Sequence, residues 1–155
     1  MSSPPTAAPP RRGHSWRAAP FRTYAGLDSL GDLADYVRSI AHGAALGEYT
    51  GLRLAVEELA VNALVHGYGT GHGWLMLTGG GDRGVGFIRL SDTAPPFDPS
   101  AAPARVPRGL ALRDRPLGGL GIPLALAGVD GYRYEYVDGT NRSTLTVRRR
   151  PAGRP

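Results

Sequence analysis

Residues 52–68 read LRLAVEELAVNALVHGY, and polar side chains recur at four-residue steps in this mostly apolar stretch. Glu58, Asn62 and His66 would lie in one line along an α-helix. A helix that is otherwise apolar all round is expected to be buried, where a carboxylate is costly unless it has a partner or a task. The line therefore predicts a site that combines a carboxylate for proton transfer with an amide oxygen able to ligate Mg²⁺. The competing interpretation is a polar edge hydrogen-bonded to a neighbouring loop.

The composition is that of one globular domain. The chain has 155 residues, of which 41% are hydrophobic and 20% charged, enough to bury a core. No run approaches the roughly 18 apolar residues of a membrane helix, and the Pro-rich start lacks the apolar core of a secretory signal. We therefore expect a cytoplasmic protein with no membrane partner. The absence of cysteine excludes disulfides, thiolate zinc sites and cysteine nucleophiles.

The net charge of +5 is weak evidence for nucleic-acid binding. All eighteen basic residues are arginine, and several of them lie near the ends, among them those at positions 11, 12, 148, 149 and 150. Because the basicity belongs partly to the flanks, we expect no direct nucleic-acid partner.

The two ends of the chain differ in composition from its middle. Residues 1–14 are rich in Pro, Ser and Ala, which bury too little surface to offset ordering. We therefore expect a disordered extension there, a folded domain over 15–149 and a short tail over 150–155. Within the domain, Trp16, Phe21 and Tyr24 suggest a short edge strand before the first helix.

Helical and alternating patterns predict the remaining elements. Apolar residues at steps of three and four predict a helix over 27–45, with Asp28 or Ser29 as N-cap. The helix of residues 52–68 should end near His66 and Gly67. Period-two runs predict two hairpins, 74–78 with 85–90 around TGGGDRG and 132–137 with 143–148 around 138–141. The tyrosines of 132–137 should pack on the sheet rather than stack on bases.

Two motifs bracket the segment 92–118, whose length is typical of a functional loop. SDTAPPFDP (91–99) places Asp92 at a strand end, where it can accept a hydrogen bond from a ligand amino group. GGLGIPL (118–124) opens a short helix through Ala127, and glycines there let backbone N–H groups approach phosphates. Taken singly, each motif could also be an ordinary turn.

The order of these motifs closely resembles the ATP-binding domain of the GHKL superfamily, which includes gyrase, MutL and histidine kinases. NALVHGY, PPFDP, GGLGIPL and NRSTLTV are similar to the small bacterial anti-sigma-factor serine kinases of the RsbW and SpoIIAB type. The resemblance covers about residues 15–149. It implies an α+β two-layer sandwich, the Bergerat fold, with a mixed, mostly antiparallel sheet and helices on one face.

The resemblance also implies roles for individual residues. Glu58 would be the general base, Asn62 the Mg²⁺ ligand, and Asp92 the carboxylate that binds the adenine amino group. The loop after Asp92 would be the ATP lid, in which Arg113 and Arg115 could add positive charge. His66 is not settled by the resemblance and is better explained as a packing or capping histidine. The positions expected to contact the nucleotide are Asn62, Asp92, Ala94, Pro96, Gly118, Gly119, Leu120, Gly121 and Thr144.

The function that the resemblance implies is an ATP- and Mg²⁺-dependent anti-sigma-factor serine/threonine kinase. Its partners would be a sigma factor and an anti-anti-sigma protein of the STAS type, which it phosphorylates, and it could form a homodimer. The alternatives are a weak or inactive ATP-binding module that sequesters its partner, and a nucleic-acid-binding domain supported only by the arginines. One departure from the family is Ala94, where glycine is frequent, and it predicts weaker nucleotide binding or an altered loop path.

Overall fold

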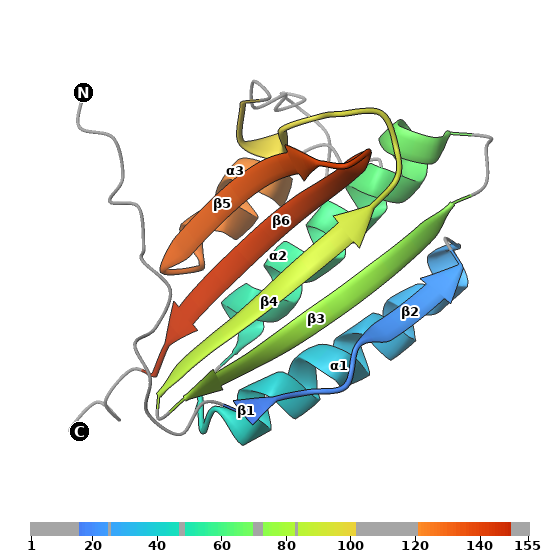
Figure 1. Ribbon diagram of the computed structural model, residues 1–155. Helices are drawn as coiled ribbons and strands as arrows, with labels where there is room; N and C mark the ends of the chain where they lie inside the picture. Colours follow the sequence, from blue (N-terminus) through green and yellow to red (C-terminus); the bar gives the residue numbers. More distant parts are fainter. Residues whose placement is uncertain are drawn as a thin grey trace, which may run out of the picture.

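The computed structural model describes residues 16–24, 26–46, 49–69, 73–82, 84–101 and 121–149. In this part of the chain, one antiparallel sheet is covered on a single face by three α-helices (Figure 1). This arrangement confirms the predicted α+β two-layer sandwich. The extension 1–14, the tail 150–155 and the loop between 102 and 120 lie outside the described residues.

The sheet has the order β1-β3-β4-β6-β5, with β2 also paired to β3. Every described pairing is antiparallel. The pairing of β4 with β6 joins strands far apart in sequence and places Asp92 opposite Asn141. The strands are β1 (Trp16–Arg17), β2 (Phe21–Tyr24), β3 (Trp74–Asp82), β4 (Val85–Asp92), β5 (Gly131–Val137) and β6 (Thr140–Arg148).

The helical elements follow the predicted order. The first helix begins one turn later than its apolar pattern, and Ser29 at its N-cap position bonds to the Gly26 carbonyl (2.6 Å) instead of capping a helical N–H. The long helix changes to a π-helical turn after Asn62. The elements are η1 (Leu27–Ser29), α1 (Leu30–Gly43), α2 (Thr50–Asn62), η2 (Ala63–Tyr68), η3 (Pro99–Ala101) and α3 (Gly121–Ala127). No helix among these is long and apolar enough to cross a membrane.

A single core lies between the helices and the sheet. Alternate residues of β3, β4 and β6 are buried, as expected for a sheet with one covered face. Each fully buried aliphatic side chain contributes about 1.5–3 kcal/mol relative to exposure. The largest of these side chains are Leu33, Val37 and Ile40 of α1, Leu52 and Val56 of α2, and Leu75, Leu77, Ile88 and Leu145 of the sheet.

The turns of the two predicted hairpins are shorter in the structure than the sequence pattern indicated. Gly79, Gly80 and Gly81 belong to β3 and not to a loop. A Cβ at Gly79 would lie 2.7 Å from Ile40 Cδ1, so glycine lets α1 lie directly on the strand. The second turn narrows to Asp138 and Gly139, which have φ of 51° and 71°, and Asn141 becomes part of β6.

Candidate functional site

A cavity of about 280 Å³ lies between the end of α2, the loop after β4 and the neighbouring ends of β4 and β6. Asn62 and His66 line it from the helical side. Asp92 and Asn141 line it from the strands, and the loop that follows β4 closes the remaining side with Ala94, Pro95, Pro96 and Phe97. The fold therefore brings the helical motif and the SDTAPPFDP motif to one place.

Five residues predicted for the site line this cavity, namely Asn62, His66, Asp92, Ala94 and Pro96. His66 is exposed and lies in the last turn of η2, a position that fits the predicted capping role better than the predicted packing role. Gly118, Gly119, Leu120, Arg113 and Arg115 lie outside the described residues.

Asp92 is a buried carboxylate at the end of β4, with 6% of its surface exposed. Its Oδ1 accepts two hydrogen bonds, from the Ala94 N–H (3.0 Å) and from Asn141 Nδ2 (2.8 Å). Burial raises the pKa of Asp92, while the bonds from Asn141 and Ala94 act in the opposite direction. Because the described residues use Oδ1 alone, Oδ2 remains available as an acceptor for a ligand in the cavity.

Asn141 is a site residue that the sequence did not single out, because it was assigned to a turn. It is 5% exposed and bridges Asp92 and the loop after β4. The available signal was the alternation of β6, in which Asn141, Ser143, Leu145 and Val147 share the buried face.

Tyr68 is a second residue that sequence reasoning missed. Its hydroxyl donates to the Trp74 carbonyl (2.7 Å) and accepts from the Thr93 N–H (2.8 Å), with Thr93 Oγ1 at 3.2 Å. These bonds hold the end of η2 against the residue that follows Asp92. The Tyr68 hydroxyl thus fixes the helical wall of the cavity relative to the strand wall.

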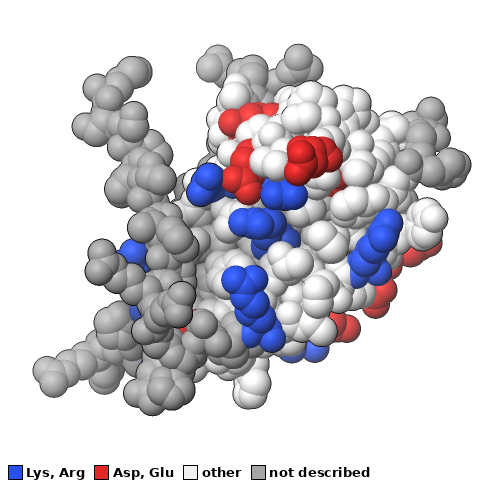
Figure 2. All heavy atoms as spheres, viewed as in Figure 1, with Lys and Arg blue, Asp and Glu red and all other residues white. Residues whose placement is uncertain are grey.

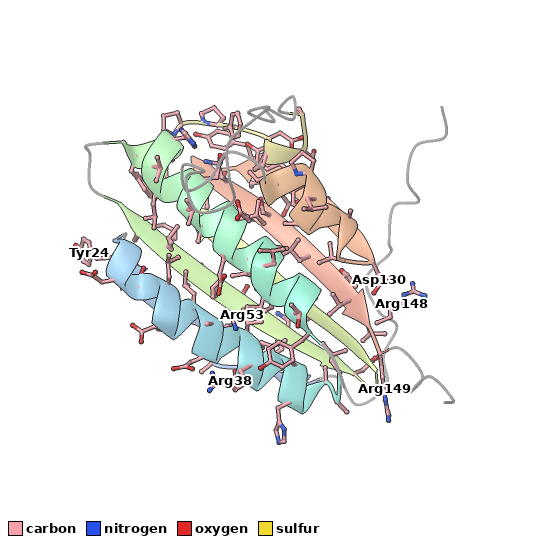
Figure 3. All side chains as sticks on the ribbon, turned by 180° about the vertical axis from the view of Figure 1, so that it is seen from behind. Tyr24, Arg38, Arg53, Asp130, Arg148 and Arg149 are labelled. Atoms are coloured by element: carbon pink, nitrogen blue, oxygen red, sulfur yellow. The ribbon has the colours of Figure 1, made fainter. Side chains whose placement is uncertain are left out.

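Glu58 lies one turn before Asn62 on α2, and it does not line the cavity. Its Oε2 is buried and makes no hydrogen bond to the described residues. Burial raises the pKa of Glu58, and the charge of Glu57 raises it further. The carboxylate lies against Gly121 at the start of α3, where any Cβ would overlap it. Glu57 itself pairs with Arg53 (2.9 Å), which is labelled on α2 in Figure 3.

Two expectations about the site need correction. Thr144 does not line the cavity, because alternation places it on the opposite face of β6, where it accepts a hydrogen bond from Arg89 Nε (3.1 Å). Ser143 lines the cavity instead. The helical segment is also not buried all round, since Leu54 and Val65 are 40% and 42% exposed.

Ala94 fits its position without backbone strain. It is 4% exposed, and it is not among the described residues with positive φ. A Cβ at Gly67 would lie 2.7 Å from the Ala94 methyl group. Glycine at position 67 therefore makes room for the side chain at position 94, and the loop path does not depend on glycine there.

The residues present suit a Mg²⁺-nucleotide better than a metal held by protein alone. No group of three His, Cys, Asp or Glu side chains comes together among the described residues. The Asn62 amide oxygen and the Glu58 carboxylate are hard donors one turn apart, and Mg²⁺ commonly takes one or two protein oxygens plus phosphates. Asn62 is the residue that could hold such a cation at the cavity.

A scan against protein families finds a match over residues 24–149 to the family described as the histidine kinase-like ATPase domain. This match covers the cavity and almost the whole described structure. A search of curated proteins finds no significant match. The chain therefore belongs to the histidine kinase-like ATPase domain family of the GHKL superfamily, and it is an ATP-binding, kinase-like module.

Proposed function

We propose that this protein is a cytoplasmic serine/threonine kinase that binds a sigma factor and phosphorylates an anti-anti-sigma protein of the STAS type. The main observation in its support is that one cavity holds Asp92 and Asn62, with Glu58 one turn along α2. The family match supports ATP binding, and the motifs NALVHGY, PPFDP, GGLGIPL and NRSTLTV support the anti-sigma-factor subtype.

Adenine would bind at the Asp92 end of the cavity. Its amino group would donate to Asp92 Oδ2, and the loop after β4, whose Pro95, Pro96 and Phe97 line the cavity, would cover the ring. A cavity of about 280 Å³ is large enough for a base but not for a whole nucleotide. The triphosphate would therefore pass Asn62 and extend out of the cavity toward the start of α3.

Phosphoryl transfer would occur next to Glu58, one turn before the end of α2. The hydroxyl oxygen of the substrate forms a bond to the γ-phosphorus, the bond from that phosphorus to the β–γ bridging oxygen breaks, and ADP leaves. Glu58 takes the hydroxyl proton, and its raised pKa makes it a better base than an exposed carboxylate. Asn62 would hold Mg²⁺, which would offset the negative charge of the phosphates when bound.

One observation favours a second function, an ATP-binding module that sequesters its partner without transfer. Glu58 lies against Gly121 instead of at the cavity wall. In that case, ATP binding would order the surface that contacts the partner, and no phosphate would leave the nucleotide.

Transfer of labelled phosphate from ATP to a STAS-type protein distinguishes the two functions. Glu58→Gln should abolish transfer and retain ADP binding, whereas Asn62→Ala should weaken binding of Mg²⁺-ADP. Glu57→Gln is the matched control and should retain transfer. Unchanged transfer in Glu58→Gln would show that Glu58 is not the base, and ADP binding without transfer by the wild type would favour sequestration.

A further inference from the structure

Asn141 of β6 is bonded to three other parts of the chain through one side chain. Its Nδ2 donates to Asp92 Oδ1 (2.8 Å), the Ala94 carbonyl (2.9 Å) and the Pro95 carbonyl (3.2 Å). Its Oδ1 accepts from the Phe97 N–H (3.2 Å) and from the Tyr134 hydroxyl (2.6 Å). The end of β4, the following loop and β5 are therefore all bonded to this residue of β6.

The orientation of the Asn141 amide is determined by its neighbours. Three acceptors surround Nδ2, while the backbone N–H of Phe97 can only donate. With 5% of its surface exposed, Asn141 would leave several buried groups unpaired if it were removed. Such losses cost about 1–3 kcal/mol for each unsatisfied group.

The bond from the Asn141 amide nitrogen determines which oxygen of Asp92 is left to face the cavity. Asn141 and the Ala94 N–H both bind Oδ1, so the carboxylate cannot rotate without losing two hydrogen bonds. Asp92 lines the cavity, and its remaining oxygen would present an acceptor there. An acceptor favours the 6-amino group of adenine and opposes the 6-oxo group of hypoxanthine, whose oxygen also only accepts.

We propose that Asn141 is a positioning residue for base recognition: it fixes the Asp92 carboxylate and the loop 94–97, and so sets a preference for 6-amino over 6-oxo purine nucleotides. The proposal rests on the nucleotide binding of the proposed function, but it does not require phosphoryl transfer.

Binding of ADP and of IDP to the full chain tests this role. Asn141→Asp keeps the acceptor for Phe97 and Tyr134 but replaces the permanent amide donor with a carboxyl group, which can bond to Asp92 only if one of the two acids is protonated. We expect it to lose about tenfold or more in ADP affinity and to bring the ratio of ADP to IDP affinity toward one. Tyr134→Phe removes only the bond on the acceptor side, and Thr146→Val alters the opposite face of β6. Both should keep the wild-type ratio.

The outcomes separate the two proposals. A wild type that binds no ADP would contradict the proposed function itself. Suppose instead that the wild type prefers ADP and that Asn141→Asp leaves the ratio of ADP to IDP affinity unchanged. This result would overturn only the positioning role of Asn141. A change in the ratio cannot arise from reduced stability, because both nucleotides need the same folded protein.

A measurement on the wild type covers the case in which Asn141→Asp does not fold. The chain contains two asparagines and no glutamine, and both asparagines line the cavity. The side-chain amide NMR spectrum of ¹⁵N-labelled protein therefore contains two NH₂ pairs, which Asn62→Ala assigns. The Asn141 pair should shift with ADP and much less with IDP, whereas the Asn62 pair should respond to adding Mg²⁺ to bound ADP. An Asn141 pair that does not respond to ADP would overturn the proposal.

Discussion

Asp92 and Glu58 both have raised pKa values, but they differ in what surrounds the charge. Asp92 is held by two hydrogen bonds on one oxygen, whereas the buried oxygen of Glu58 has no partner among the described residues. A carboxylate fixed by donors is suited to binding. A carboxylate desolvated without donors is suited to accepting a proton.

The pH dependence of transfer should follow Glu58. Transfer requires the ionised carboxylate, so the rate falls as pH falls through its raised pKa. Glu57→Gln removes a negative charge that raises this pKa and leaves the positive charge of Arg53 nearby, so the acid limb should move to lower pH. A pH–rate profile of labelled transfer checks this, and an acid limb that stays in place or moves upward would contradict the assignment.

The sequence predicted those site residues whose spacing is local. Glu58 and Asn62 are related by the helical period, and Asp92 lies where an alternating run meets prolines. Asn141 could not be found in this way, because its role depends on the pairing of β4 with β6 and on the register that sets it opposite Asp92. Thr144 was predicted one residue from the correct position, and one residue reverses the face of a strand.

At the scale of elements, the sequence pattern predicted the helices and strands but not the places where glycine lets them pack closely together. The pattern of residues 52–68 predicted the long helix, but nothing in it placed Gly51 against Gly128 of the turn after α3. Likewise, TGGGDRG was interpreted as a loop because glycine is frequent in turns. The structure shows that Ile40 of α1 packs over Gly79, the first of these glycines.

Two glycine substitutions around α2 should have opposite effects on stability and transfer. A Cβ at Gly121 would overlap the Glu58 carboxylate, which is the end of a flexible side chain and can move. Gly121→Ala should therefore reduce transfer strongly while changing the free energy of unfolding by less than about 1 kcal/mol. A Cβ at Gly51 would overlap the Gly128 carbonyl, so Gly51→Ala should cost about 1–3 kcal/mol. Chemical denaturation and labelled transfer measure both, and wild-type transfer in Gly121→Ala would contradict the placement of Glu58.

The contact between η2 and the loop after β4 should appear as coupling between Gly67 and Ala94. Gly67→Ala places two methyl groups 2.7 Å apart and should cost about 1–3 kcal/mol through overpacking. Adding Ala94→Gly should recover at least half of that loss, because it removes the opposing methyl group. A double-mutant cycle on unfolding free energies measures the coupling; additive effects would mean that the two residues do not share this space.

At the scale of the molecule, arginines gather on the uncovered face of the sheet. Figure 2 shows basic side chains over the middle of this face and acidic side chains clustered at its upper end. Glu135 pairs with two of these arginines, Arg133 (3.1 Å) and Arg89 (3.9 Å). The order of motifs along the chain predicted the fold, but this gathering of arginines depends on which strand faces remain uncovered.

Removing Glu135 should therefore cost more than removing an ordinary surface acid. Glu135→Gln should lower the free energy of unfolding by about 0.5–1 kcal/mol at low salt, because Arg89, Arg133 and the cross-strand neighbour Arg142 then repel. The loss should shrink in high salt. Asp35→Asn is the control, since Asp35 and Arg38 form an ion pair in which both side chains are 67% exposed (Figure 3). Equal effects of the two variants would contradict the role of Glu135.

The glycines of β3 have a mechanical consequence. Where α1 crosses Gly79, the Ile40 side chain of the helix packs directly on the strand backbone, with no side chain of the strand between them to yield under load. Packed interiors are nearly incompressible and pass on strain. A partner that bends the hairpin of β3 and β4 would therefore displace α1 with it, and the two would respond to force as a single stiff plate.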